Sequence, residues 1–111
     1  MNSIPEEQII ARIKIAAWVM GVSYSDILIN SHCPHKNNDK IGDTRQAIMY
    51  CLANFLELSH KKSGEFLSRS SQAVTHAMRR IEDEQHLYKK YKYKGSRMSV
   101  IEEIQYIFND K

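Results

Sequence analysis

The residues of this chain best suited to bind a ligand are cationic and hydroxyl side chains gathered between Ser59 and Arg97. This stretch holds ten Lys or Arg against four Asp or Glu, a local balance of +6, although the whole chain carries only +3. The rest of the chain therefore carries a net charge of −3. Ammonium and guanidinium groups bind phosphate oxygens, so this asymmetry favours an electrostatic surface for nucleic acid. The alternative is a solvated basic helix face, which is common in proteins.

The strongest local pattern is a polar break around Ser68 between two helical segments. Ser59 is suited to cap a first, short helix, and after the break a longer helix carries apolar residues every three or four positions from Val74 to Ile81. We therefore predict a helix-turn-helix over about residues 59–86. In that arrangement the N-terminal turn of the second helix enters the DNA major groove while the first helix lies across the backbone.

The residue types at this N-terminal turn suit the reading of bases. Gln72 can bond both N6 and N7 of adenine, Arg69 can fork onto guanine or hold a phosphate, and serine is an adaptable donor or acceptor. The alternative is that Ser-Arg-Ser-Ser is a serine-rich helix cap and Gln72 an exposed polar residue. The candidate contact residues of this turn are Arg69, Ser70, Ser71, Gln72 and Thr75. The cations expected mainly to hold phosphates are Lys61, Lys62, Arg79 and Arg80.

The rest of the chain must supply the scaffold, and its composition favours helices. Only four Gly and two Pro occur, and 111 residues with 42% hydrophobic residues can bury one modest core. We predict an all-α fold with five or six helices, in a single domain over residues 1–111. The stretch 30–42 is rich in turn residues and predicts a surface loop, with Asp43 or Thr44 capping the helix that follows. Besides the helix-turn-helix, apolar spacing predicts helices over about residues 4–20, 24–28, 44–56 and 98–108.

Residues 43–82 resemble the C-terminal duplex-DNA-binding domain of the bacterial chromosomal replication initiator DnaA, a Trp-repressor-like helical domain. Thr44–Tyr50 is similar to the family's T-P-R-Q-I-A-M-Y, and Val74–Glu82 is similar to V-x-H-A-x-x-K-I-E. Gly64 fits the glycine of the family's S-L-x-x-I-G-x-x-F helix. With a similar helix layout upstream, the likeness covers roughly Ile9–Glu82.

The resemblance implies roles for several residues of this chain. Arg45 stands where the family sends an arginine into the minor groove, Arg69 aligns with a phosphate or base contact, and His76 looks structural or phosphate-facing, with a partly buried ring favoured. Ser70–Ala73 replace the family's base-reading Asp-His-Thr-Thr, which implies altered specificity. The family also holds phosphates with a basic loop before the Arg-Gln helix, where this chain offers Lys36 and Lys40.

These observations predict sequence-selective binding of double-stranded DNA in bacterial or phage replication or transcription control. The chain lacks a G-x-x-x-x-G-K-[ST] phosphate loop and the length for a nucleotide-binding domain, so ATP-driven initiation is not expected of it. Met1 favours a stand-alone relative over an excised domain. The alternative function is a protein-interaction module that kept the scaffold and lost DNA reading. Its apolar C-terminal segment, Val100–Phe108, would then pair with a partner or with a second copy of the chain. The alternative for this segment is that it closes the core of the domain.

No cofactor and no metal are expected. His32, Cys33 and His35 fit no standard spacing of zinc ligands, and Cys51 on an apolar helix face suits a small core residue. Paired carboxylates, a nucleophile elbow and a Gly-rich loop are not recognisable, so an enzyme is not expected. The sequence shows neither a secretory signal nor an apolar run of ~20 residues, which predicts a cytoplasmic protein without a membrane span.

The stretch Tyr88–Lys94 interleaves tyrosines with lysines. Aromatic rings among cations stack on bases and neutralise phosphates in single-strand binders. The alternative is a solvated helix end whose lysines suit the negative C-terminal dipole. The sequence leaves both interpretations open.

Overall fold

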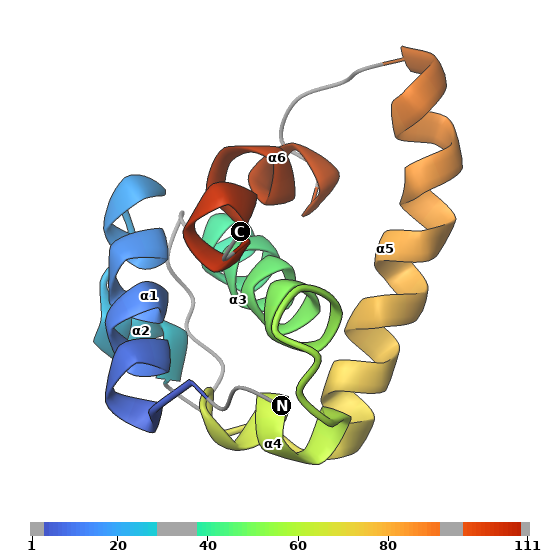
Figure 1. Ribbon diagram of the computed structural model, residues 1–111. Helices are drawn as coiled ribbons and strands as arrows, with labels where there is room; N and C mark the ends of the chain where they lie inside the picture. Colours follow the sequence, from blue (N-terminus) through green and yellow to red (C-terminus); the bar gives the residue numbers. More distant parts are fainter. Residues whose placement is uncertain (1–3, 29–37, 92–96, 110–111) are drawn as a thin grey trace.

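Apolar side chains at three- and four-residue spacing build helices throughout the described part of the chain (Figure 1). The computed structural model describes residues 4–28, 38–91 and 97–109, with side chains for 4–28, 40–85 and 98–109. Within these ranges the chain forms six helices and no strand, so the predicted all-α fold is confirmed. The helices are α1 (Glu6–Val19), α2 (Tyr24–Leu28), α3 (Asn38–Asn54), α4 (His60–Glu65), α5 (Ser71–Tyr91) and α6 (Arg97–Phe108).

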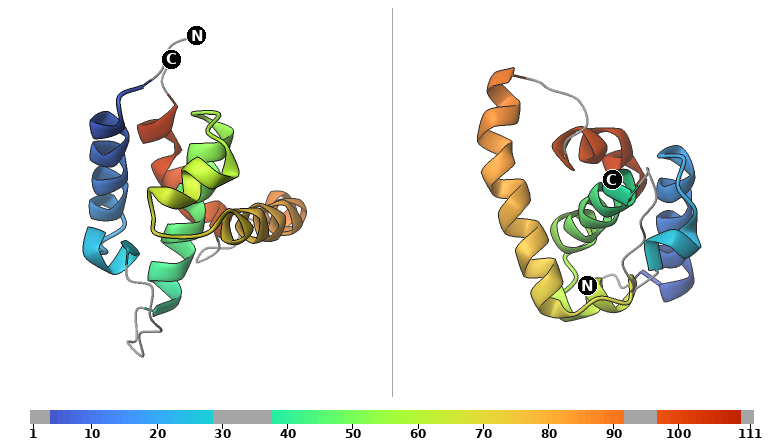
Figure 2. Two further views of the ribbon diagram at one scale, coloured as in Figure 1. Left: turned by 90° about the horizontal axis from the view of Figure 1, so that it is seen from below. Right: turned by 180° about the vertical axis from the view of Figure 1, so that it is seen from behind.

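Helix α3 is the centre of the fold and contacts every other helix. Helices α1 and α2 lie on one side of it and α5 on the other, while α6 packs along it and α4 lies beneath (Figures 1 and 2). The predicted apolar face of α3 is confirmed, because Ala47, Ile48, Cys51 and Leu52 are fully buried. These residues join buried side chains of α1, α5 and α6 in one core cluster.

Helix α3 starts earlier than predicted. The sequence predicts a loop up to Gly42 and a helix cap at Asp43 or Thr44. The helix already begins at Asn38, and Thr44 is a fully buried residue inside it rather than a cap. Ile41 explains the difference: it lies one turn before Thr44, and burial of its side chain extends the apolar stripe toward the N-terminus. Residues 30–37 of the predicted loop lie outside the described residues.

Helix α6 closes the core. Its apolar side chains Val100, Ile101, Ile104 and Phe108 are buried, and α6 packs mainly on α3. The hypothesis that this face pairs with a partner or a second copy is therefore wrong, because the same face is already covered inside the domain. Among the described large hydrophobic side chains of α6, Tyr106 is the exposed one.

In the ranges that the structure describes, no helix combines the length and the apolar character required to cross a bilayer.

Candidate nucleic-acid interface

Helices α4 and α5 and the connection between them occupy the place where the sequence predicts the helix-turn-helix. The Ser59 hydroxyl accepts a hydrogen bond from the Lys62 backbone N–H at 3.1 Å, so the predicted cap of α4 is confirmed. α4 ends at Glu65, and residues 66–70 lead into α5. Ser68 adopts a positive φ of 57°, which turns the chain between the two helices.

Gly64 allows the backbone of the connection, residues 66–70, to pack directly against α4. The Arg69 backbone N–H donates to the Gly64 carbonyl at 2.8 Å, and the Leu67 N–H donates to the same oxygen at 2.9 Å. A Cβ on Gly64 would lie 2.5 Å from the Arg69 carbonyl oxygen and 2.9 Å from that of Ser70. Gly64 therefore sets the path of the segment that carries Arg69. The sequence signal for this role is a glycine in the interior of a short helix.

The first turn of α5 is capped by one of the predicted contact residues. The Ser70 hydroxyl accepts a hydrogen bond from the Ala73 backbone N–H at 3.2 Å, and the Ser70 carbonyl accepts from Val74 N–H at 3.3 Å. Ser70 thus satisfies a backbone donor that the helix leaves unpaired. Ser71 and Gln72 follow it with exposed side chains.

Thr75 ties α5 to α4. Its Oγ1 lies 3.0 Å from the Ser71 carbonyl oxygen and 2.9 Å from His60 Nδ1. A hydroxyl has one hydrogen, so when Thr75 donates to Ser71, His60 must donate from Nδ1. This link occupies the Thr75 hydroxyl, and the sequence offers no signal for it because His60 belongs to the other helix.

Replacing Ser70 by Ala is expected to lower the free energy of unfolding by about 1 kcal/mol, because the Ala73 N–H loses its acceptor. For a chain of this size that corresponds to a fall in Tm of roughly 4 °C, measured by circular dichroism. Ser71→Ala removes an exposed hydroxyl from the next position and is the matched control. Equal Tm values for the two variants would contradict the capping role.

Arg45 and Arg69 are brought together although they belong to different segments. Arg45 Nε donates to the Ile27 carbonyl at 2.8 Å and Nη2 to the Asp26 carbonyl at 3.1 Å, at the C-terminal end of α2. Burial lowers the pKa of Arg45, and the positive charge of Arg69 lowers it further. Burial also lowers the pKa of Arg69, whose Nη1 donates to the Ser68 carbonyl at 3.1 Å.

The other predicted cations lie on α4 and α5. Lys61, Arg79 and Arg80 are exposed, whereas Lys62 forms an ion pair with Glu6. The expected partial burial of His76 is wrong: its side chain is exposed. The reason is its position on α5, where the residues at 74, 77 and 81 form the buried face and 76 lies off it.

Among the predicted cations that the structure describes, Lys40 does not join this surface. Lys40 belongs to α3 instead of a loop, and its Nζ lies beside Gly21 at the connection between α1 and α2. Lys36 and the side chains of the Tyr88–Lys94 stretch lie outside the described residues. The backbone of α5 runs helically through Tyr91, five residues past the predicted end at 86.

The described residues contain no group of three or more His, Cys, Asp or Glu able to hold a metal ion. His32, Cys33 and His35 lie outside these residues. Cys51 is a buried free cysteine of the core, which confirms the prediction for this residue. Burial raises the pKa of its thiol to about 12.

The stability of the protein is expected to fall as pH rises above about 9, because the unfolded Cys51 thiol loses its proton while the buried thiol keeps it. The contribution of this thiol to the free energy of unfolding is fully present below the pKa that the thiol has in the unfolded chain. Above that pH it declines by about 1.4 kcal/mol per pH unit, up to the pKa of the thiol in the folded protein. Urea unfolding at several pH values between 8 and 11 measures it. Cys51→Ala should show a correspondingly shallower decline, and parallel curves would contradict the prediction.

Comparisons with protein-family models, with curated proteins and with solved structures gave no match to this chain.

Proposed function

We propose that this protein binds double-stranded DNA. In this proposal the first turn of α5 lies in the major groove and the Arg45–Arg69 pair contacts the phosphates of the DNA backbone. The observation that carries the proposal is this pair. Two partly buried guanidinium groups lie close enough for one charge to lower the pKa of the other. A phosphate between or beside them would relieve both the repulsion and the lost hydration, and guanidinium forks match phosphate oxygens.

The bonds of Arg45 support a phosphate contact in place of the minor-groove contact that the resemblance implies. Two of its five N–H donors are used by carbonyls at the end of α2, which hold the side chain against the domain. A side chain anchored in this way presents its charge at the surface but does not extend freely into a narrow groove. The remaining donors suit an anion that approaches from outside.

The exposed side chains of α4 and α5 complete the proposed interface. Ser71 and Gln72 would contact base edges, since both are exposed in the first turn of α5. Lys61, Arg79 and Arg80 would hold phosphates, and the exposed His76 lies one helical turn before the two arginines on α5. Because Ser70 caps the helix and Thr75 is bonded to His60, we assign these two residues to positioning the turn. The process served would be replication or transcription control.

A fluorescence-anisotropy titration tests the proposal with three labelled probes: a randomised duplex, a duplex carrying AT-rich initiator-type boxes, and a single strand of the same length. Each is measured at low and near-physiological salt. We expect binding to the duplex, with a logarithm of the binding constant that falls linearly as the logarithm of the salt concentration rises. Preference for the boxes would show that the altered turn still selects the family's site. No duplex binding at low salt would overturn the proposal.

A protein-interaction role is the second candidate, favoured by a different surface from the one the sequence indicates. Ile15 and Trp18 lie three residues apart on α1 and are 49% and 80% exposed. Neighbouring exposed hydrophobic residues of this size are typical of protein contacts. Trp18 is the sole tryptophan of the chain, so its fluorescence reports on this face. A blue shift with a protein partner, but none with duplex, would identify α1 as a separate docking face.

A further inference from the structure

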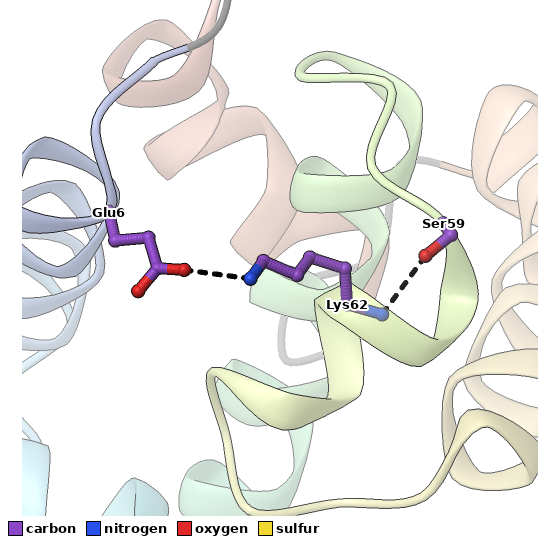
Figure 3. A network of polar contacts seen from close by, with 3 residues as sticks. All are labelled: Glu6, Ser59 and Lys62. Atoms are coloured by element: carbon purple, nitrogen blue, oxygen red, sulfur yellow. Dashed lines mark hydrogen bonds and ion pairs between the residues drawn. The ribbon is translucent and has the colours of Figure 1, made fainter.

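Lys62 does not stand free on α4 but reaches across to α1 (Figure 3). Its backbone N–H is held by the Ser59 hydroxyl, which places the residue in the first turn of α4. Its Nζ donates to Glu6 Oε1 at 2.8 Å and lies 5.6 Å from the centre of the Phe66 ring. The ammonium is thus balanced by a carboxylate that lies 56 positions away in the sequence.

This ion pair is accessible and therefore open to exchange. The exposed fractions of the Lys62 and Glu6 side chains are 43% and 66%. The hydrogen bond and the charge of the partner lower the pKa of Glu6 and raise that of Lys62, so both groups are charged at neutral pH. An exposed pair of this kind is weak in water, and a second anion of comparable charge can compete for the lysine.

We propose that Glu6 is a built-in competitor of DNA phosphate for Lys62, so that the first turn of α1 limits the affinity of α4 for DNA. This inference rests on the proposed function and adds an affinity-determining residue outside the two contact helices. A phosphate that approaches Lys62 meets an ammonium whose charge is already neutralised. Either the lysine leaves Glu6, at the cost of the ion pair, or the phosphate is held near a carboxylate that repels it.

The test compares Glu6→Gln with Glu7→Gln in the duplex titration. Both changes remove one negative charge from an exposed residue in the first turn of α1, and only Glu6 is joined to Lys62. Glu6→Gln is expected to tighten duplex binding about two- to fivefold more than Glu7→Gln does. The slope of log K against log salt should become steeper by up to about one, because one more cation is available to phosphate.

Lys62→Ala in both backgrounds completes a double-mutant cycle. Lys62→Ala should reduce duplex affinity more in the Glu6→Gln background than in the wild-type protein, because the Lys62 ammonium is fully available to phosphate only when Glu6 is replaced. Equal affinities and slopes for the two Gln variants would overturn the inference while leaving DNA binding intact. No duplex binding by the wild-type protein would instead overturn the proposed function. Unchanged Tm values for the Gln variants exclude an effect through folding.

Discussion

Replacing Gly64 by Ala is expected to destabilise the protein by about 2–3 kcal/mol, a fall in Tm of roughly 8–12 °C. The added Cβ would lie 2.5 Å from the Arg69 carbonyl oxygen and 2.9 Å from that of Ser70. Both obstacles are backbone atoms, so no rotation of a side chain relieves the overlap. The connection between α4 and α5 must move away from α4, and the hydrogen bond from Arg69 N–H to Gly64 must lengthen with it.

Gly42→Ala is the matched control for this change. Gly42 is also inside a helix, but no atom lies within 4 Å of the position that its Cβ would take. There the substitution should stabilise the protein by roughly 0.5–1 kcal/mol, because alanine loses less backbone entropy in a helix than glycine does. Thermal unfolding should therefore move the two variants in opposite directions. A wild-type Tm for Gly64→Ala would show that the connection is not closely packed on α4.

Gly64→Ala should also weaken duplex binding at temperatures where the variant is folded. The displaced connection carries Arg69 and the Ser70 cap, so the first turn of α5 loses its position relative to Arg45. Anisotropy measured well below the Tm of the variant separates this effect from unfolding. Normal affinity in a destabilised variant would place the DNA contacts away from this connection.

Replacing Arg45 and Arg69 together by Ala is expected to weaken duplex binding about 100-fold, and each single change about tenfold. These values correspond to the loss of one charge-assisted contact for each residue. If both residues bind phosphates, as we propose, the loss should be similar for random and box-containing duplexes, and the salt slope should fall by about one for each residue. Lys40→Ala, which removes an exposed cation beside Gly21, controls for the change in net charge.

Arg45→Ala should carry a second effect that Arg69→Ala need not share. Removal of its guanidinium leaves the carbonyls of Asp26 and Ile27 without this donor at the end of α2, which should cost about 1–2 kcal/mol of stability. Arg45→Lys keeps the positive charge but cannot reproduce both bonds. Unchanged duplex affinity of the folded double variant would remove the docking geometry proposed for this pair.

Much of the fold follows from local sequence. The buried stripes of α3, α5 and α6 match the spacing of their apolar residues, and Ser59 caps α4 as its type predicts. The errors have local causes as well. Ile41 is an isolated apolar residue among turn-forming neighbours, so its burial at the start of α3 was not apparent. The apolar face of α6 could have met either the core or a partner, since both choices bury the same atoms.

The candidate site was predictable only as a set of residue types. Charge and the serine-rich break indicate Arg69, Ser71 and Gln72, and the structure places Ser71 and Gln72 with exposed side chains at the start of α5. Their partners were not predictable. Nothing in the neighbourhood of Lys62 indicates that Glu6 neutralises it, and nothing near Thr75 indicates a bond to His60.

The sequence by itself determined the apolar stripes of the helices and the Ser59 cap of α4, because these features depend on residues within about four positions of one another. It also determined the excess of positive charge after Ser59, which is a matter of composition. Tertiary structure alone decided which charges meet. It brought Arg45 close to Arg69, joined Lys62 to Glu6 and used Gly64 to admit the backbone of the connection. Such contacts depend on how helices pack around α3, and packing is set by the burial of all apolar faces together, which no short pattern records.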